Sequence, residues 1–383
     1  MIPLSDIQKS VAPGSVTKEK LQIFKPGPDL PAPLESVGII GWLKQNLFPS
    51  TLNSILTIAA LGFLYKILPP LISWMIIDAN WSMSAVPDTT EGVIEKTGAC
   101  WTFIFVKFRV LMLGLYPEQF LWRPVLAFFL FVLVCAITAF RLLRVKILTG
   151  LWFFLPVPLY YLINGGMGLP FVDQSLWGGL MLSTGLAAIG IIMSIPLGIL
   201  LALGRRSKMI IVKSMCVGII ESIRGVPLIT ILFMASVMLP IFLPRGMDIN
   251  NLLRIQIGII LFSSAYIAEV VRGGLQAIPQ GQIEAADSLG LPGWVVTLFV
   301  ILPQALRHVI PSLIGRCVAL FKDTSLVIIV GLLDFLGMIK ASAQDPEWLG
   351  YDAEAYVFCA LVYWVICFSM SQYGKSIERR NQW

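Results

Sequence analysis

WGGLMLSTGLAAIGIIMSIPLGILLAL is the sequence of residues 177–203, and no side chain in it is charged. A helix needs about 20 apolar residues to cross the hydrocarbon core of a bilayer, so this run is long enough to span a membrane. The strands of membrane barrels are shorter and alternate in polarity, and this run does not alternate. The run therefore predicts a membrane-spanning helix.

Similar apolar runs lie on both sides of this stretch, at residues 53–77, 124–140, 147–163, 216–243, 255–271, 306–333 and 355–373. Of the 383 residues, 57% are hydrophobic and 13% are charged. A water-soluble fold cannot bury that much apolar surface, so the chain needs a lipid bilayer around it. We expect an all-α polytopic membrane protein with about eight transmembrane helices.

Basic residues are distributed by loop, although the formal net charge of +6 could suggest a nucleic-acid partner. They follow the second run, the fourth run and the last run, at Arg141, Arg144, Lys146, Arg205, Arg206, Lys208, Lys213, Lys375, Arg379 and Arg380. Loops rich in Lys and Arg stay in the cytoplasm, whereas residues 165–175 carry Asp173 and no basic residue, as a translocated loop should. We expect both termini to be cytoplasmic, and we expect no nucleic-acid partner.

The chain divides near Asp173 into an N-terminal part and a core. We expect residues 1–50 to form a flexible cytoplasmic tail with an interfacial helix at 37–48, and residues 51–172 a three-helix membrane extension with an external hairpin. Residues 173–376 form the expected core, and residues 377–383 a cytoplasmic tail. Residues 99–115 are apolar, but Lys107 and Arg109 interrupt them, so they are assigned to the hairpin, where an amphipathic interfacial helix could form.

Signals for catalysis, metal binding or nucleotide binding are missing from the sequence. Gly374, Lys375 and Ser376 imitate the end of a phosphate loop, but Ser369 occupies the place of its first glycine. His308 is the only histidine, which excludes a histidine triad and a multi-histidine metal site. We therefore expect no catalytic residue, no metal and no cofactor, and any vectorial work must be energised by another subunit.

The loop between the sixth and seventh runs contains QAIPQGQIEAADSLGLPGW, residues 276–294. Glu284 and Asp287 are expected at early positions of a short helix, where carboxylates suit the positive end of the helix dipole. A spacing of three gives this helix an apolar stripe of Ile283, Ala286 and Leu289.

Gly290 can adopt the left-handed conformation that ends such a helix, and Pro292 prevents its continuation. A short helix that is both acidic and apolar, standing in the cytoplasm, suits the groove of a partner protein.

This loop resembles the cytoplasmic signature of the membrane subunits of ABC importers, which is Glu-Ala-Ala, three residues, Gly, nine residues and Ile-x-Leu-Pro. The matching residues are Glu284, Ala285, Ala286, Gly290, Leu302 and Pro303, with Val300 in place of isoleucine. Residues 265–274, 302–305 and 322–326 resemble the polar-amino-acid branch of that family, the permeases for histidine, glutamine and arginine. So do residues 224–228, where Val226 replaces threonine.

The resemblance covers residues 177–375, while residues 41–48 and the first three runs look like the longer permeases of general L-amino-acid systems. It implies an ABC importer (MetI-like) permease core in the bacterial inner membrane. An ABC ATPase dimer that binds ATP would dock on Glu284, Ala285, Ala286, Asp287 and Gly290. A second homologous permease subunit and a periplasmic amino acid binding protein would complete the importer.

Four polar residues, Lys322, Asp323, Thr324 and Ser325, interrupt the seventh run. Polar groups inside a membrane helix cost a few kcal/mol each at mid-depth, so they need a local reason. A helix broken there would place two half-helix ends and a lysine–aspartate pair near the midplane, as in many transporter substrate sites. The alternative is an internal ion pair that fixes the break without touching substrate.

Two charged pairs have a spacing of three, Glu221 with Arg224 and Glu269 with Arg272, and each can pair on one helix face. Arg224 precedes Pro227, where an unwound helix could face the pathway, and its guanidinium suits a carboxylate. We therefore add Arg224 to the predicted substrate pathway for L-amino acids.

Two other functions remain open at the level of the sequence. An ion-coupled secondary amino acid carrier would work without an ATPase and would use carboxylates such as Asp323 as cation sites. A membrane scaffold or sensor would move no substrate at all. The acidic amphipathic loop favours the importer, because a carrier that powers itself needs no docking helix.

Overall fold

The computed structural model describes residues 38–82, 98–166, 168–244, 246 and 249–381, and it forms two units, residues 1–72 and 73–383. The predicted flexible tail up to residue 37 and the centre of the predicted hairpin, residues 83–97, lie outside the described residues. The first unit contains α1 (Gly38–Leu47) and α2 (Thr51–Ile72). Thr57 Oγ1 donates a hydrogen bond to the Leu47 carbonyl at 2.7 Å and ties the two helices together.

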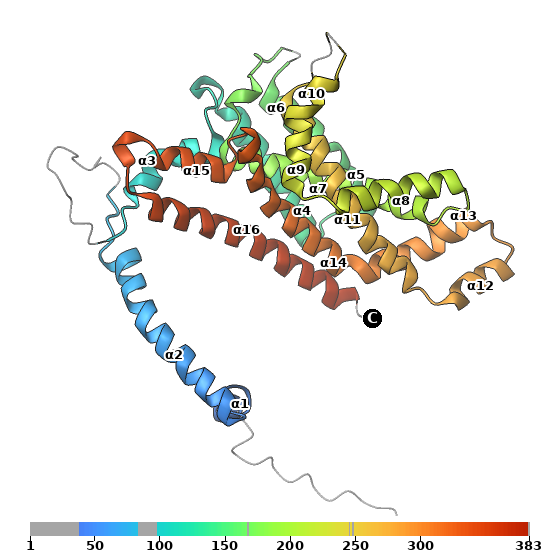
Figure 1. Ribbon diagram of the computed structural model, residues 1–383, viewed down its shortest axis with the longest axis horizontal. Coiled ribbons are helices and arrows are strands. Elements are labelled where there is room, and N and C mark those ends of the chain that lie inside the picture. Colours follow the sequence, from blue (N-terminus) through green and yellow to red (C-terminus); the bar gives the residue numbers. More distant parts are fainter. Residues whose placement is uncertain (1–37, 83–97, 167, 245, 247–248, 382–383) are drawn as a thin grey trace, which may run out of the picture. The chain divides into compact units, whose positions relative to one another are not determined.

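The second unit is helical throughout its described elements (Figure 1). Its N-terminal half contains η2 (Ser73–Ile77), α3 (Thr102–Leu113), η3 (Glu118–Phe120), α4 (Trp122–Phe140), α5 (Val145–Phe154), α6 (Pro156–Asn164), η4 (Gln174–Leu176) and α7 (Gly179–Arg205). The remainder contains α8 (Ile210–Arg224), α9 (Leu228–Phe233), η5 (Met234–Met238), α10 (Leu239–Phe242), α11 (Asn251–Gln276), α12 (Gln280–Ser288), α13 (Gly293–Val295), η6 (Val296–Ile301), α14 (Leu302–Asp323), η7 (Thr324–Val330), α15 (Phe335–Ala343), η8 (Pro346–Trp348) and α16 (Asp352–Asn381).

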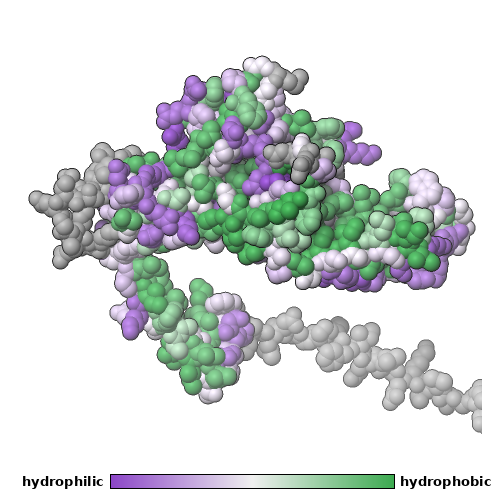
Figure 2. All heavy atoms as spheres, turned by 45° about the horizontal axis from the view of Figure 1, so that its top comes forward, coloured by the Kyte–Doolittle hydropathy of each residue, from purple (hydrophilic) through white to green (hydrophobic). Residues whose placement is uncertain are grey.

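The all-α membrane class is confirmed, although fewer helices than predicted qualify as spans. In the described residues, six helices are long and apolar enough to cross a membrane, or seven if one bent pair counts as a span. The predicted span at 306–333 is not among them, because its helix α14 carries Arg307, Arg316 and Lys322. Figure 2 shows a broad hydrophobic surface across the second unit, with hydrophilic residues along its margins.

The predicted span at 216–243 is a bent pair of helices, and its break lies where the sequence allowed an unwound helix beside Pro227. It is divided between α8 and the segment Leu228–Phe242, which bends away by 105°. α8 ends at Arg224, and Pro227 stands in an extended conformation just before α9. Proline disfavours helical geometry at the residue before it, which accords with the break between α8 and α9.

Residues 99–115 form a packed helix, whereas the sequence suggested a helix lying at the membrane interface. α3 packs against α7, α15 and α16, and it buries Phe103 and Leu111 in the second unit. The two charges that interrupt the run are paired, since Lys107 Nζ lies 2.6 Å from Asp345 Oδ2 and Arg109 Nη1 lies 2.8 Å from Glu118 Oε1. The bond with Lys107 lowers the pKa of Asp345.

The centre of the second unit is the packing of α7 against α11, and of α11 against α14. A Cβ atom on Gly198 of α7 would lie 2.6 Å from Ile267 Cγ2, and one on Gly274 of α11 would lie 2.8 Å from the Ala305 carbonyl oxygen. Small residues of this kind let membrane helices approach closely where no hydrophobic effect drives them together.

A backbone joint ties the start of α7 to the start of α15. The Gly179 amide donates to the Leu333 carbonyl at 2.9 Å, and Asp334 caps α15 by accepting from the Gly337 amide at 3.0 Å. Asp334 is fully buried, and burial raises its pKa to about 6. This joint places the start of α7, near the beginning of the predicted core, next to the start of α15.

Candidate coupling helix and substrate pathway

The helix α12 carries the motif residues on an exposed face. It lies at one end of the second unit, away from α3 and α15 (Figure 1). Glu284, Ala285 and Asp287 are exposed to solvent, whereas Ala286 is buried among residues of α11, η6 and α14. The helix therefore has one side packed on the membrane domain and one side open to a partner.

Two details of the predicted α12 are wrong. The helix begins at Gln280 after Pro279, so Glu284 and Asp287 lie in its middle and last turns and not at its positive end. The predicted stripe also stops early, because Leu289 lies beyond the last helical residue and is 78% exposed. The terminator is confirmed, since Gly290 has a φ of +69° in the left-handed region.

The position of α12 is fixed by the helix that returns to the membrane. Gln304 Nε2 donates to Gln282 Oε1 at 3.3 Å and to the Val300 carbonyl at 2.8 Å, which links α12 to the start of α14. Trp294 of α13, which follows α12, is 64% exposed. We call Glu284, Ala285, Asp287, Leu289 and Trp294 the coupling surface.

The four polar residues of the seventh run lie where an α-helix changes into a 3₁₀ helix, with no residue between the two helices. α14 ends at Asp323, and the chain continues directly as the 3₁₀ helix η7 from Thr324. Thr324 Oγ1 donates to the Phe321 carbonyl and Ser325 Oγ to the Lys322 carbonyl, each at 2.8 Å. Both hydroxyl groups therefore satisfy backbone carbonyls at the junction.

The predicted Lys322–Asp323 pair is not among the ion pairs of the described residues. Lys322 is exposed and Asp323 is half-buried. Adjacent residues point about 100° apart around a helix, so their side chains do not face each other. Asp323 lies instead within the electrostatic reach of Arg316, on the preceding turns of α14.

Arg224 belongs to a cluster of charges from α7, α8 and α11. Arg224 Nη1 and Arg205 Nη1 each lie 3.6 Å from Glu269 Oε2, and Arg272 donates to Glu269 from one turn along α11. The Glu269–Arg272 pair is thus present as its spacing suggests. Glu221 pairs with Arg205 at 2.8 Å across to α7, in place of Arg224 on its own helix.

Arg316 is a residue of this region that the sequence reasoning missed. Its guanidinium lies over the ring of Tyr266 at 4.4 Å from the centroid, and that of Arg224 lies over the same ring at 5.7 Å. Arg316 Nε and Nη2 are buried and have no hydrogen-bond partner among the described residues. Arg316 is the one charged side chain of residues 309–321, and this was a signal that could have identified it.

The arrangement presents one complete edge of a guanidinium group. Nε and Nη2 of Arg316 are the two donors that bind a carboxylate in a bidentate manner. Asp323, half-buried and near Arg316, supplies an acceptor of the kind that an ammonium group needs. The site of Arg316, Tyr266 and Asp323 thus matches both charges of a zwitterion.

Comparisons with known proteins place the chain in a family. A family model described as "Binding-protein-dependent transport system inner membrane component" matches residues 194–382. Among solved structures, the crystal structure of an amino acid ABC transporter with histidines covers 53% of this chain and 92% of its own, with 29% sequence identity and a TM-score of 0.48.

Two relatives match nearly from end to end. The inner membrane amino-acid ABC transporter permease protein YhdY of Escherichia coli strain K12 is 47% identical over 356 residues, 92% of this chain and 96% of that protein. The glutamate/glutamine/aspartate/asparagine transport system permease protein BztC of Rhodobacter capsulatus is 36% identical over 415 aligned positions, 91% of this chain and 95% of that protein. The chain therefore belongs to the inner-membrane permease family of amino-acid ABC transporters.

Proposed function

We propose that this permease imports polar L-amino acids across the bacterial inner membrane, with both termini in the cytoplasm. The observation that carries the proposal is the 47% identity to an amino-acid ABC transporter permease over 96% of that protein's length. The second relative is named for glutamate, glutamine, aspartate and asparagine. We propose that this chain accepts the same group, because Arg316, Arg224 and Lys322 make its polar region predominantly basic.

We propose three protein partners for this chain. An ABC ATPase dimer docks on the coupling surface of α12, which is exposed and acidic on its open side. A second homologous permease pairs with this chain, and a periplasmic binding protein delivers the amino acid. The chain itself performs no covalent chemistry, because ATP is bound and hydrolysed by the ATPase subunits.

The proposed substrate site consists of Arg316, Tyr266 and Asp323, with Arg224 and the junction at Lys322, Thr324 and Ser325 beside it. Arg316 receives the α-carboxylate through its free edge, and Asp323 receives the ammonium group. Because both donor atoms of Arg316 are buried, α11 and α14 have to separate before a carboxylate reaches them. Such an opening and closing is what alternating access requires.

Uptake into proteoliposomes tests the proposal. The complete complex contains both permeases, the ATPase and the binding protein. It should accumulate radiolabelled glutamate, glutamine, aspartate or asparagine only when ATP is present on the side of the membrane that carries the ATPase subunits. Dissipating ion gradients with ionophores should leave this uptake unchanged. Uptake that needs an ion gradient and no ATP would instead identify a secondary carrier, and no uptake of any amino acid would favour a scaffold or sensor.

A further inference from the structure

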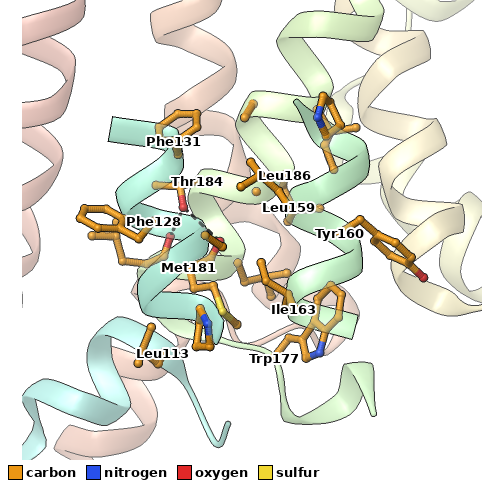
Figure 3. A pocket seen from close by; sticks show the side chains of 18 of the residues that line it. Leu113, Phe128, Phe131, Leu159, Tyr160, Ile163, Trp177, Met181, Thr184 and Leu186 are labelled. Atoms are coloured by element: carbon orange, nitrogen blue, oxygen red, sulfur yellow. Dashed lines mark hydrogen bonds between the residues drawn. The ribbon is translucent and has the colours of Figure 1, made fainter. Parts of the chain in front are cut away.

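An apolar cavity of about 390 Å³ lies between the helices α4 and α6 on one side and α7 on the other. Its walls come from α4, α6 and α7, with contributions from α3 and α11 (Figure 3). α3 packs directly on α7, whereas α4 and α6 pack chiefly on each other. The cavity therefore fills the place where the hairpin of α4 and α6 would otherwise meet α7.

The lining of the cavity excludes the amino acid substrate. None of the described residues that line it is charged, and most are aliphatic or aromatic, such as Phe128, Leu159 and Leu186 in Figure 3. The Thr184 hydroxyl is already bound to the carbonyls of Leu180 and Met181, at 2.8 and 3.0 Å. Apolar cavities of even about 150 Å³ stay dry and take up apolar molecules.

One end of the cavity carries a buried donor without a partner. Trp177, 8% exposed, lines this end, and its Nε1 has no hydrogen-bond acceptor among the described residues. Its ring packs edge-on against Tyr160 at 5.9 Å between centroids. Tryptophan side chains of membrane proteins concentrate at the membrane–water interface, where one end is apolar and the other polar. The ligand of this cavity should thus be apolar along its length, with its polar end beside Trp177.

The dimensions and the surroundings fit one leaflet of a membrane. On α7 the lining runs from Leu180 to Ile192, which at 1.5 Å per residue is about 18 Å. Half of a hydrocarbon core is about 15 Å deep. Val125 and Phe128 of α4 line the cavity and are also 55% and 53% exposed, so its rim reaches the apolar surface of the protein.

We propose that this cavity holds an acyl chain of a membrane phospholipid, with the ester end of the chain beside the ring of Trp177. The lipid fills the space between the α4–α6 hairpin and α7 and joins the N-terminal extension to the core. The site is separate from the proposed amino acid pathway, so a test of lipid binding does not depend on which amino acid is transported.

A glycine in the wall allows the cavity to be filled without a clash. Gly185 of α7 lines the cavity, and a Cβ atom built on it meets nothing within 4 Å. Gly150 of α5 is also free of neighbours within 4 Å but does not line the cavity. Gly185→Leu and Gly150→Leu are therefore a matched pair, since both add the same side chain within a helix of the same unit.

The test uses the whole transporter complex, purified in mild detergent and washed until the phospholipid content is constant. Native mass spectrometry and phosphate analysis then give the phospholipid bound per complex. We expect the parent and Gly150→Leu to retain phospholipid equally and Gly185→Leu to retain several-fold less.

Three results would overturn the proposal. They are equal phospholipid in the two leucine variants, a cavity that holds only detergent, and a parent complex that retains no phospholipid because the second permease covers the site. If Gly185→Leu fails to assemble, Ala188→Leu fills the same cavity from the next turn and takes its place in the comparison.

Discussion

At the scale of single residues, two guanidinium groups lie over one tyrosine ring. Arg224 and Arg316 come from different helices and meet at Tyr266 of α11. Arg224 has Glu269 at 3.6 Å, although its buried Nε has no hydrogen-bond partner among the described residues, and Arg316 has two such nitrogen atoms, Nε and Nη2. A buried donor without a partner is costly, so it is retained where a ligand supplies the missing acceptor.

The first prediction at this scale concerns Arg316. Arg316→Gln should reduce amino acid uptake by about 10- to 100-fold, because a hydrogen bond to a charged group contributes roughly 1.5–3 kcal/mol and each 1.4 kcal/mol is tenfold in affinity. Uptake into proteoliposomes at several substrate concentrations measures the change. Basal ATPase activity and thermal stability should stay near those of the parent.

Arg307→Gln is the matched control, because Arg307 is also an arginine of α14 but is exposed and lies outside the proposed site. It should change uptake much less than Arg316→Gln does. A complex with Arg316→Gln that imports at the parental rate would remove Arg316 from the pathway. Equal losses in both variants would show that the loss is not specific to the proposed site.

The sequence could identify which residues of this region are polar but not which of them meet. Lys322 and Asp323 are neighbours in the chain, yet a helix turns adjacent side chains away from each other. Glu221 and Arg224 have the spacing of a helical pair, yet the nearness of α7 and α11 gives each a partner on another helix. Such pairings depend on helix packing, which no local spacing contains.

At the scale of elements, one face of α12 packs on the membrane domain and the opposite face is exposed. Ala286 is buried against the membrane domain, and Gln304 holds the helix from α14. A force applied to the exposed side of α12 therefore reaches α11 and α14, the helices that carry Tyr266 and Arg316. The element thus connects the proposed ATPase contact to the proposed substrate site.

Reversing one charge on α12 tests this connection. Glu284→Lys should reduce uptake at least tenfold while leaving folding unchanged, because Glu284 is exposed and faces the proposed partner. The amount of ATPase that copurifies with the permease, together with uptake, measures the effect. Glu284→Gln, which removes the charge without reversing it, should have a milder effect. Full ATPase binding and normal uptake with Glu284→Lys would contradict the proposed docking.

The sequence predicted a short helix that Gly290 ends, because that signal is local. It placed Glu284 and Asp287 too close to the start, since α12 already begins at Gln280.

A break at Pro227 was within reach of the sequence, because Glu221, Arg224 and Pro227 interrupt the apolar residues 216–243. The angle of the bend was not, because it depends on the tertiary packing of α9 against α11.

At the scale of the whole molecule, the fold class could be predicted because a bilayer leaves few alternatives. Each spanning segment has to satisfy its own backbone hydrogen bonds, so long apolar runs become helices. The role of α3 could not be predicted in the same way. Lys107 and Arg109 of α3 indicate polar surroundings, but the sequence does not show their partners. Asp345 is far away in the sequence and Glu118 lies beyond the end of α3, so these pairs are seen only in the folded chain.

The orientation in the membrane remains a prediction from charge, and cysteine labelling checks it. Asp173→Cys should react with a membrane-impermeant maleimide in intact cells after removal of the outer membrane. Lys208→Cys should react only once the cytoplasmic face is opened. The six native cysteines are free, so labelling is measured against a parent in which they are replaced by serine. The opposite pattern would place α12 outside and refute the proposed ATPase contact.

The exposure of Leu289 and Trp294 has a consequence for the life of the chain in the cell. These two apolar side chains, 78% and 64% exposed, are open to water until a partner covers them. A permease synthesised in excess of its ATPase thus displays a surface of the kind that chaperones and proteases recognise in unassembled proteins. Its abundance would then be set by the supply of its partner, so that the cell accumulates complete importers and degrades orphan subunits.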